Sequence, residues 1–222
     1  MKIRIENFAK KTELLCAFTL ENSNKVIGLP KFEASTTLSI SQSLRDTNGK
    51  LGKLSIVHTT GKRPIKRILL AGIGKKEEIT TDTIRIVSGK IAQKARELKL
   101  KEFSIISPPN FVSEPNSAVA QIIEGAKMSL YKFDKFKSEK SDAAINLTII
   151  VSKSSKVLTS AKKAEVIADG TIFTKSIANL PPNECTPTTL ANFAKTISKN
   201  KKMKCRIISE PELKKKRFLL KA

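Results

Sequence analysis

The stretch Arg67-Ile68-Leu69-Leu70-Ala71-Gly72 decides the fold. It is an almost continuous apolar run, which is typical of a strand buried on both faces of a sheet. A helix capped by Thr81 should follow, with one apolar stripe at spacings of three and four made by Ile84, Val87, Ile91, Ala95 and Leu98. Residues 102–107 supply the returning strand, so residues 67–107 are predicted to form a βαβ unit.

The segments around this unit extend the same pattern. A helix over about residues 117–131 and a strand over 145–151 predict a second unit, and residues 54–58 read as another strand. At the N-terminus, residues 2–6 and 12–20 are predicted strands of an early hairpin or a sheet edge, followed by a helix around 35–44 and a turn at Asn48-Gly49. The predicted fold class is α/β, with a mixed sheet flanked by helices.

The C-terminal third predicts helices and one strand. Residues 156–178 read as a long linking helix with an inward apolar face made by Val157, Ala161, Ala164, Ala168, Ile172 and Phe173. Thr186-Pro187 should open a further helix, whose apolar face consists of Leu190, Phe193, Ala194 and Ile197. Residues 203–208 read as a strand, which would leave an unfinished layer.

Composition limits the class of protein. The 222 residues can bury a sizeable core, and no apolar run approaches the ~20 residues of a membrane-spanning helix, so we expect a soluble, cytoplasmic protein. The three cysteines Cys16, Cys185 and Cys205 are far apart and include no Cys-x-x-Cys pair, which argues against a disulfide framework or a thiolate zinc site. A single histidine, His58, excludes His-x-x-x-His zinc sites.

The net charge of +22 leaves nucleic-acid binding as an alternative that we do not favour. Residues 1–150 hold 26 Lys and Arg against 15 Asp and Glu, whereas residues 151–222 hold 16 against 5, so the basic excess is densest near the C-terminus. Aromatic residues make up only 5% of the chain, which supplies few platforms for stacking bases. We expect the lysine-rich faces to be solvated or to meet an acidic partner segment.

Several residues are of types that could act in catalysis or ligand binding, but each is better interpreted as structural. His58 is expected to be a partly buried strand residue, and Gly72-Ile73-Gly74 a tight turn, because Glu77 stands where a dinucleotide fingerprint needs its third glycine. Glu165 and Asp169 share a helical face beside two lysines, which is typical of a solvated charge cluster. Cys185 has no base within sequence reach and is expected to be inert.

Four stretches, in order, resemble one enzyme family. They are the strand ending in Gly72-Ile73-Gly74, Glu124-Gly125-Ala126, Tyr131-Lys132-Phe133-Asp134-Lys135-Phe136-Lys137, and Asn179-Leu180-Pro181-Pro182-Asn183-Glu184-Cys185-Thr186-Pro187. Together they are similar to the leucyl aminopeptidase (cytosol aminopeptidase) family. The resemblance implies a macro-domain-like domain over residues 1–152, a linking helix over 153–178, and the start of a metallopeptidase domain over 179–222.

The resemblance also implies a function. Family enzymes remove N-terminal residues from peptides with two divalent ions (zinc, manganese or magnesium) and usually form hexamers through their catalytic domains. Their Gly-x-Asp-Ser-Gly-Gly and Asn-Thr-Asp-Ala-Glu-Gly-Arg segments do not occur here. We therefore predict no catalytic, cofactor-binding or metal-binding residue and no cofactor in this chain, and we expect it to be a truncated and inactive N-terminal portion that does not form the family hexamer. The alternative is a stand-alone macro-like or basic module that binds a nucleotide or nucleic acid.

Overall fold

A six-stranded sheet lies at the centre of the computed structural model, which describes residues 1–8, 12–23, 26–28, 34–59, 65–110, 113–138, 145–201 and 203–215. The strand order is β1-β6-β5-β2-β4-β3; every neighbouring pair is parallel except β3 and β4, which are antiparallel. The strands are β1 Ile3–Glu6, β2 Thr12–Thr19, β3 Leu54–His58, β4 Ile65–Gly72, β5 Glu102–Ile106 and β6 Asn146–Ile150. The mixed α/β sheet predicted from the sequence is confirmed.

The chain divides into an N-terminal unit, Met1–Phe173, and a C-terminal unit, Thr174–Ala222. The helices are α1 Ala34–Thr47, the 3-10 turn η1 Lys76–Glu78, α2 Thr81–Glu97, α3 Pro115–Leu130, α4 Ser155–Ala178, α5 Pro187–Lys201 and α6 Glu210–Lys215. Most of α4 belongs to the N-terminal unit, and its last turn belongs to the C-terminal unit.

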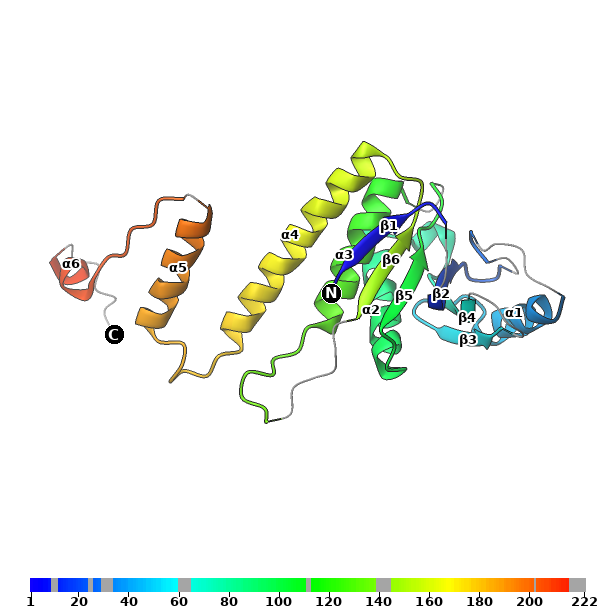
Figure 1. Ribbon diagram of the computed structural model, residues 1–222, viewed down its shortest axis with the longest axis horizontal. Coiled ribbons are helices and arrows are strands. Elements are labelled where there is room, and N and C mark those ends of the chain that lie inside the picture. The colour runs from blue at the N-terminus through cyan, green and yellow to red at the C-terminus, as the bar shows by residue number, and fades with distance from the viewer. Residues whose placement is uncertain are drawn as a thin grey trace. The chain divides into compact units, whose positions relative to one another are not determined.

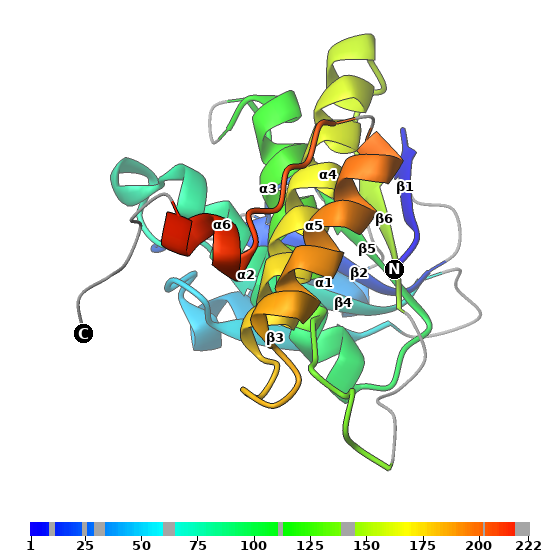
Figure 2. The same ribbon diagram turned by 90° about the vertical axis from the view of Figure 1, so that its left-hand side faces the viewer.

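The N-terminal unit has three layers (Figures 1 and 2). Alternate side chains of β2 enter two separate cores because neighbouring residues of a strand point to opposite faces. Leu14, Cys16 and Phe18 pack in the core that α2, α3 and α4 share, while Leu15 and Ala17 pack in the core that α1 covers. All five side chains are buried, so β2 is a central strand covered on both faces.

Helix α4 joins the first of these cores through small residues. Val157, Ala161 and Ala164 are buried there, and the Ser160 hydroxyl donates to the Asn116 carbonyl oxygen at 2.7 Å. The inward face predicted for this helix stops short of its end, because Phe173 is 37% exposed and Ile172 is only half-buried.

The hairpin predicted for the first two strands is wrong, whereas the sheet edge given as its alternative holds for β1. Strand β1 pairs in parallel with β6 at the edge of the sheet, while β2 lies between β4 and β5. The apolar character of β2 on both faces explains its central place, whereas β1 carries an exposed Arg4 and tolerates the edge. The βαβ unit predicted over residues 67–107 holds, with β2 inserted between its parallel strands β4 and β5.

Helix ends follow local capping chemistry. Helix α2 is capped by Thr80, one residue before the predicted Thr81, and the Thr80 amide N–H donates to Thr83 Oγ1 at 3.0 Å. In the C-terminal unit, Thr186 caps α5 as predicted, because its Oγ1 accepts from the Thr189 amide N–H at 3.2 Å.

The strand predicted over residues 203–208 is wrong, since this segment has no regular secondary structure. A strand exists only through hydrogen bonds to a neighbour, and within the described part of the C-terminal unit both neighbouring elements are helices. The segment is followed by α6, which was not predicted.

Helices α2 and α3 meet at unusually close range because of a glycine. A Cβ added to Gly125 would lie 2.1 Å from the Arg85 carbonyl oxygen, and one added to Gly89 would lie 3.3 Å from the Gly125 carbonyl oxygen. The backbones of the two helices are therefore in contact at Gly125. The physical role of glycine in Glu124-Gly125-Ala126 is this close approach.

We predict that Gly125→Ala destabilises the N-terminal unit by about 1–3 kcal/mol, because the new methyl group must push α2 and α3 apart. Gly170→Ala is the matched control: it lies in α4 with nothing within 4 Å of the added Cβ, so it should be neutral or stabilise by up to about 1 kcal/mol. Urea unfolding measures both. Equal stability of the two variants would contradict the packing account.

Candidate functional site

The carboxyl ends of the parallel strands are the first place to look for a ligand site, because ligands of open α/β sheets bind in the crevice there. In this chain the loop Gly72-Ile73-Gly74 leaves β4 at that edge, beside the turn at Asn48-Gly49. Asn48 and Gly49 have φ values of 46° and 62°, as the predicted turn requires.

The backbone amides of this edge are already engaged. The Gly72 N–H donates to the Lys53 carbonyl oxygen at 2.9 Å, the Ile73 N–H to Thr19 at 2.9 Å, and the Gly74 N–H to Gly49 at 3.0 Å. A phosphate-binding loop needs successive free amides that point at the anion. The three amides of Gly72-Ile73-Gly74 instead hold neighbouring loops together, which fits the tight-turn interpretation.

The space beside these glycines is filled by the protein's own backbone. A Cβ at Gly72 would lie 2.1 Å from the Lys50 carbonyl oxygen, and one at Gly49 would lie 2.1 Å from the Leu20 carbonyl oxygen. The glycines thus permit loops to approach each other and do not open a cradle for a ligand.

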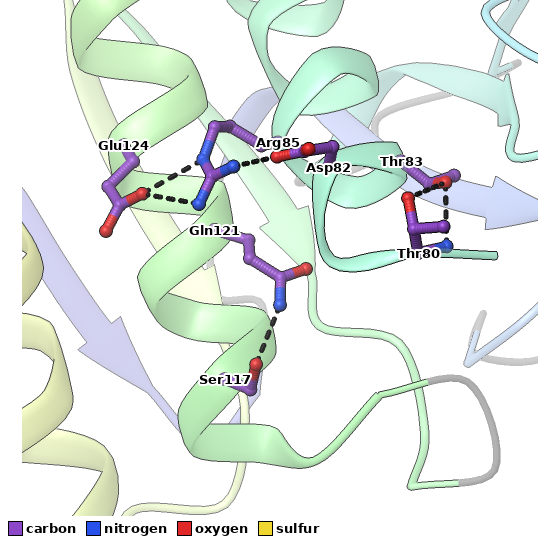
Figure 3. A network of polar contacts seen from close by, with 7 residues as sticks. All are labelled: Thr80, Asp82, Thr83, Arg85, Ser117, Gln121 and Glu124. Atoms are coloured by element: carbon purple, nitrogen blue, oxygen red, sulfur yellow. Dashed lines mark hydrogen bonds and ion pairs between the residues drawn. The ribbon is translucent and has the colours of Figure 1, made fainter.

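A polar network links α2 and α3 at the face beside Gly125 (Figure 3). The Arg85 side chain donates through Nε to Glu124 Oε2 at 2.9 Å, and its Nη2 lies 2.9 Å from the same oxygen. The Glu124 side chain is only 12% exposed and that of Arg85 33% exposed, so the pair is largely withdrawn from water. On the solvent side, Arg85 Nη1 also contacts Asp82.

Sequence reasoning did not identify this pair, although a signal was present. Glu124 is the one acidic residue of α3 and follows the apolar residues Ile122 and Ile123, and a buried carboxylate needs a cationic partner. Its partner is 39 positions away, which no local pattern reveals. Because both groups of the pair are engaged with each other, the network ties the helices together and is not a reactive centre.

The acidic residues that the structure describes do not converge as metal ligands. Asp169 lies 2.6 Å from Lys127 Nζ, Glu210 lies 2.6 Å from Lys214 Nζ, and Glu212 lies 2.5 Å from Arg206 Nη2. Among the residues that the structure describes, no group of three or more His, Cys, Asp or Glu side chains could hold a metal ion. Two-metal hydrolysis requires converging carboxylates, so this donor set does not fit a paired-ion centre.

The remaining candidate residues from the sequence are His58, Cys16 and Cys185. His58 is exposed, not partly buried as predicted, because it ends the edge strand β3 opposite Arg67. Burial raises the pKa of the Cys16 thiol well above its usual range, so this core cysteine is a poor nucleophile. Cys185 is half-buried in the turn after α4, where its amide N–H donates to the Pro181 carbonyl oxygen at 2.9 Å.

No helix within the described ranges is both long and apolar enough to cross a membrane.

The fold is similar to part of two enzymes of known structure. A tomato leucine aminopeptidase mutant matches 90% of this chain and 42% of its own chain, with a TM-score of 0.75 and 21% identity. The bottromycin maturation enzyme BotP matches 92% of this chain and 41% of its own, with a TM-score of 0.72 and 13% identity, and it has also been solved in complex with Mn. At these identities the likeness defines the class of fold.

The family follows from the sequence comparisons. The model of the cytosol aminopeptidase family, N-terminal domain, matches residues 19–140. A probable cytosol aminopeptidase of Cenarchaeum symbiosum is 36% identical over 211 residues, which are 94% of this chain and 42% of that protein. One of Roseiflexus castenholzii is 30% identical over 159 residues, 69% of this chain and 33% of that protein. The chain belongs to the cytosol aminopeptidase family and spans less than half the length of these relatives.

We predict that Arg85→Met destabilises the N-terminal unit by about 1.5–3 kcal/mol, because it leaves the Glu124 carboxylate buried without its charged partner. Adding Glu124→Gln should recover part of this loss, since a neutral amide costs less to bury. Urea unfolding of both single variants and the double variant gives the coupling energy. Asp82→Asn is the control for the exposed contact and should cost no more than about 1 kcal/mol. Strictly additive effects of Arg85→Met and Glu124→Gln would contradict the account.

We also predict that calorimetric titration with ADP-ribose gives no saturable heat, because the amides of Gly72-Ile73-Gly74 already donate to backbone carbonyl groups. A stoichiometric binding isotherm would show that this edge of the sheet rearranges to accept a nucleotide.

Proposed function

We propose that this chain is the N-terminal portion of a leucyl aminopeptidase-type metallo-exopeptidase, an enzyme that removes N-terminal residues from peptides in the cytoplasm. The family match over residues 19–140 carries the proposal, because it falls within the unit that has a complete hydrophobic core. We further propose three domains: the macro-like domain over residues 1–152, the linking helix over 153–178, and the start of the catalytic domain over 179–222.

In this proposal, the catalytic residues belong to a part of the enzyme that lies outside this chain. Hydrolysis by the family chemistry would use two ions (zinc, manganese or magnesium) that activate water and polarise the scissile carbonyl group. Such ions need several carboxylates within one pocket, whereas Asp169, Glu210 and Glu212 each neutralise a basic side chain. This chain would supply a folded scaffold, and the ion-binding residues would belong to the portion that the longer relatives carry.

Two other functions are weaker. Nucleotide binding is disfavoured because the backbone amides at the carboxyl edge of the sheet already donate to carbonyl oxygens of the protein. Nucleic-acid binding draws support from the net charge of +22, but the chain has no Trp and one Tyr to stack on bases. Assembly into the hexamers typical of the family belongs to the complete enzyme in this proposal and does not extend to this chain.

The proposal predicts that the purified chain releases no product from a leucine anilide above the blank, with manganese or zinc added, because the described residues form no paired-ion centre. The full-length Cenarchaeum symbiosum relative, assayed in parallel, is the control for the substrate and the metals. Metal-dependent release by the chain alone would overturn the proposal.

A further inference from the structure

Strand β3 forms one open edge of the sheet among the residues that the structure describes (Figure 1). It is the last strand in the sheet order and pairs only with β4, in antiparallel register. The Thr59 N–H donates to the Lys66 carbonyl oxygen at 3.1 Å, and the Gly72 N–H donates to the Lys53 carbonyl oxygen at 2.9 Å. These two bonds fix which backbone groups of β3 face β4.

Alternate residues of β3 direct their backbone groups away from β4. In an antiparallel ladder the residues of a hydrogen-bonded pair turn both groups to the partner strand, and the residues between them turn both groups outward. Since Lys53 and Thr59 bond toward β4, the outward residues are Leu54, Ile56 and His58. Their backbone groups have no hydrogen bond to any described residue. The edge thus offers a row of donors and acceptors that another strand can join.

Side-chain packing holds this row in place. Leu54 and Ile56 pack against the core that α2, α3 and α4 share, and Val57 is buried in the core that α1 covers. Anchoring on both faces fixes the backbone of β3 before a ligand arrives. Only the added strand must then be ordered, which lowers the entropy cost of pairing.

The sequence around β3 is basic. Residues 47–76 contain six Lys and two Arg and no Asp or Glu. Lys53, directly before β3, is exposed, and so is Lys66, which lies opposite the residue that follows β3. Helix α1, which covers this part of the sheet, carries one cation and one anion, Arg45 and Asp46, and leaves the sign unchanged. A positive surface favours an acidic ligand and disfavours edge-to-edge pairing of two copies of this chain.

We propose that the free edge of β3 is a docking site for an extended acidic segment of a partner polypeptide, which adds a seventh strand to the six-stranded sheet. A polypeptide is preferred over a nucleic acid because a strand supplies both N–H donors and carbonyl acceptors, whereas phosphate oxygens only accept hydrogen bonds. The site lies within the N-terminal unit and goes beyond the proposed function, since it binds a partner and takes no part in peptide hydrolysis.

Peptide titration of the full 222-residue chain tests the proposal. The probe is the capped heptapeptide Asp-Glu-Val-Thr-Val-Glu-Asp, and the readouts are NMR spectroscopy and amide hydrogen exchange. We expect saturable binding and slower exchange of the outward amides of Leu54, Ile56 and His58. The amides of Ser55 and Val57 point at β4 and should be protected with or without the peptide. The ring of His58, the only histidine, gives an isolated signal at the same edge.

Two variants with the same change in net charge separate this edge from general attraction. Lys53→Glu with Lys66→Glu should weaken peptide binding at least about tenfold, because the exposed charges beside β3 are reversed. Lys2→Glu with Arg4→Glu makes the same change at the opposite edge of the sheet, beside and within β1, and should alter binding less than about twofold because salt screens distant charges. Equal loss in the two variants would overturn the proposal.

Control ligands separate strand pairing from the alternatives. The probe N-methylated throughout its Val-Thr-Val centre keeps its charge and loses three N–H groups, so it should bind at least about tenfold more weakly. A short DNA duplex should leave the exchange of the outward amides unchanged. Absence of saturable probe binding, equal binding of the methylated peptide, or protection of the outward amides by DNA would each overturn the proposal. Protection of these amides in a concentration-dependent dimer of the chain alone would also overturn it and assign the edge to a second copy.

Discussion

The backbone contact between α2 and α3 at Gly125 is the constraint on which the N-terminal unit depends. It allows both helices to lie side by side over the sheet, where they cover β2, β4 and β5. Arg85 and Glu124 span the same contact, so the close approach also brings a buried carboxylate to its cation. Packing and charge pairing at this point support each other, since widening the gap between the helices would weaken both.

The two units differ in how they are stabilised. The first buries apolar residues on both faces of its sheet, and α4 adds Val157, Ala161 and Ala164 to one of the two cores. The second unit exposes the residues that its sequence marks as a core face, such as Leu190 and Ile197. Its helix α5 has a good N-cap at Thr186, but capping contributes only about 1 kcal/mol and does not replace a core.

Sequence patterns predicted the individual strands and helices better than they predicted which strands pair with each other. The runs of β4 and β5 were evident because strands buried on both faces are apolar almost throughout, and the stripe of α2 was evident because a helix covered on one face repeats its apolar residues with a period of 3.6. The place of β2 between β4 and β5 was missed, since pairing between distant strands leaves no local mark. Residues 203–208 have the composition of a strand but no neighbouring strand in the described unit, and composition alone does not create one. At the candidate site, the engaged amides of Gly72-Ile73-Gly74 agreed with the predicted turn, whereas the Arg85–Glu124 pair joins residues too far apart in sequence to be inferred.

The central claim is that the described residues of this member of the cytosol aminopeptidase family form no carboxylate pocket for a pair of metal ions. Equilibrium dialysis of the purified chain against manganese tests it most directly, with the full-length Cenarchaeum symbiosum relative as the reference. The account predicts no stoichiometric retention of manganese by the chain at concentrations that load the relative. Retention of a pair of ions per chain, reversed by a chelator, would contradict it.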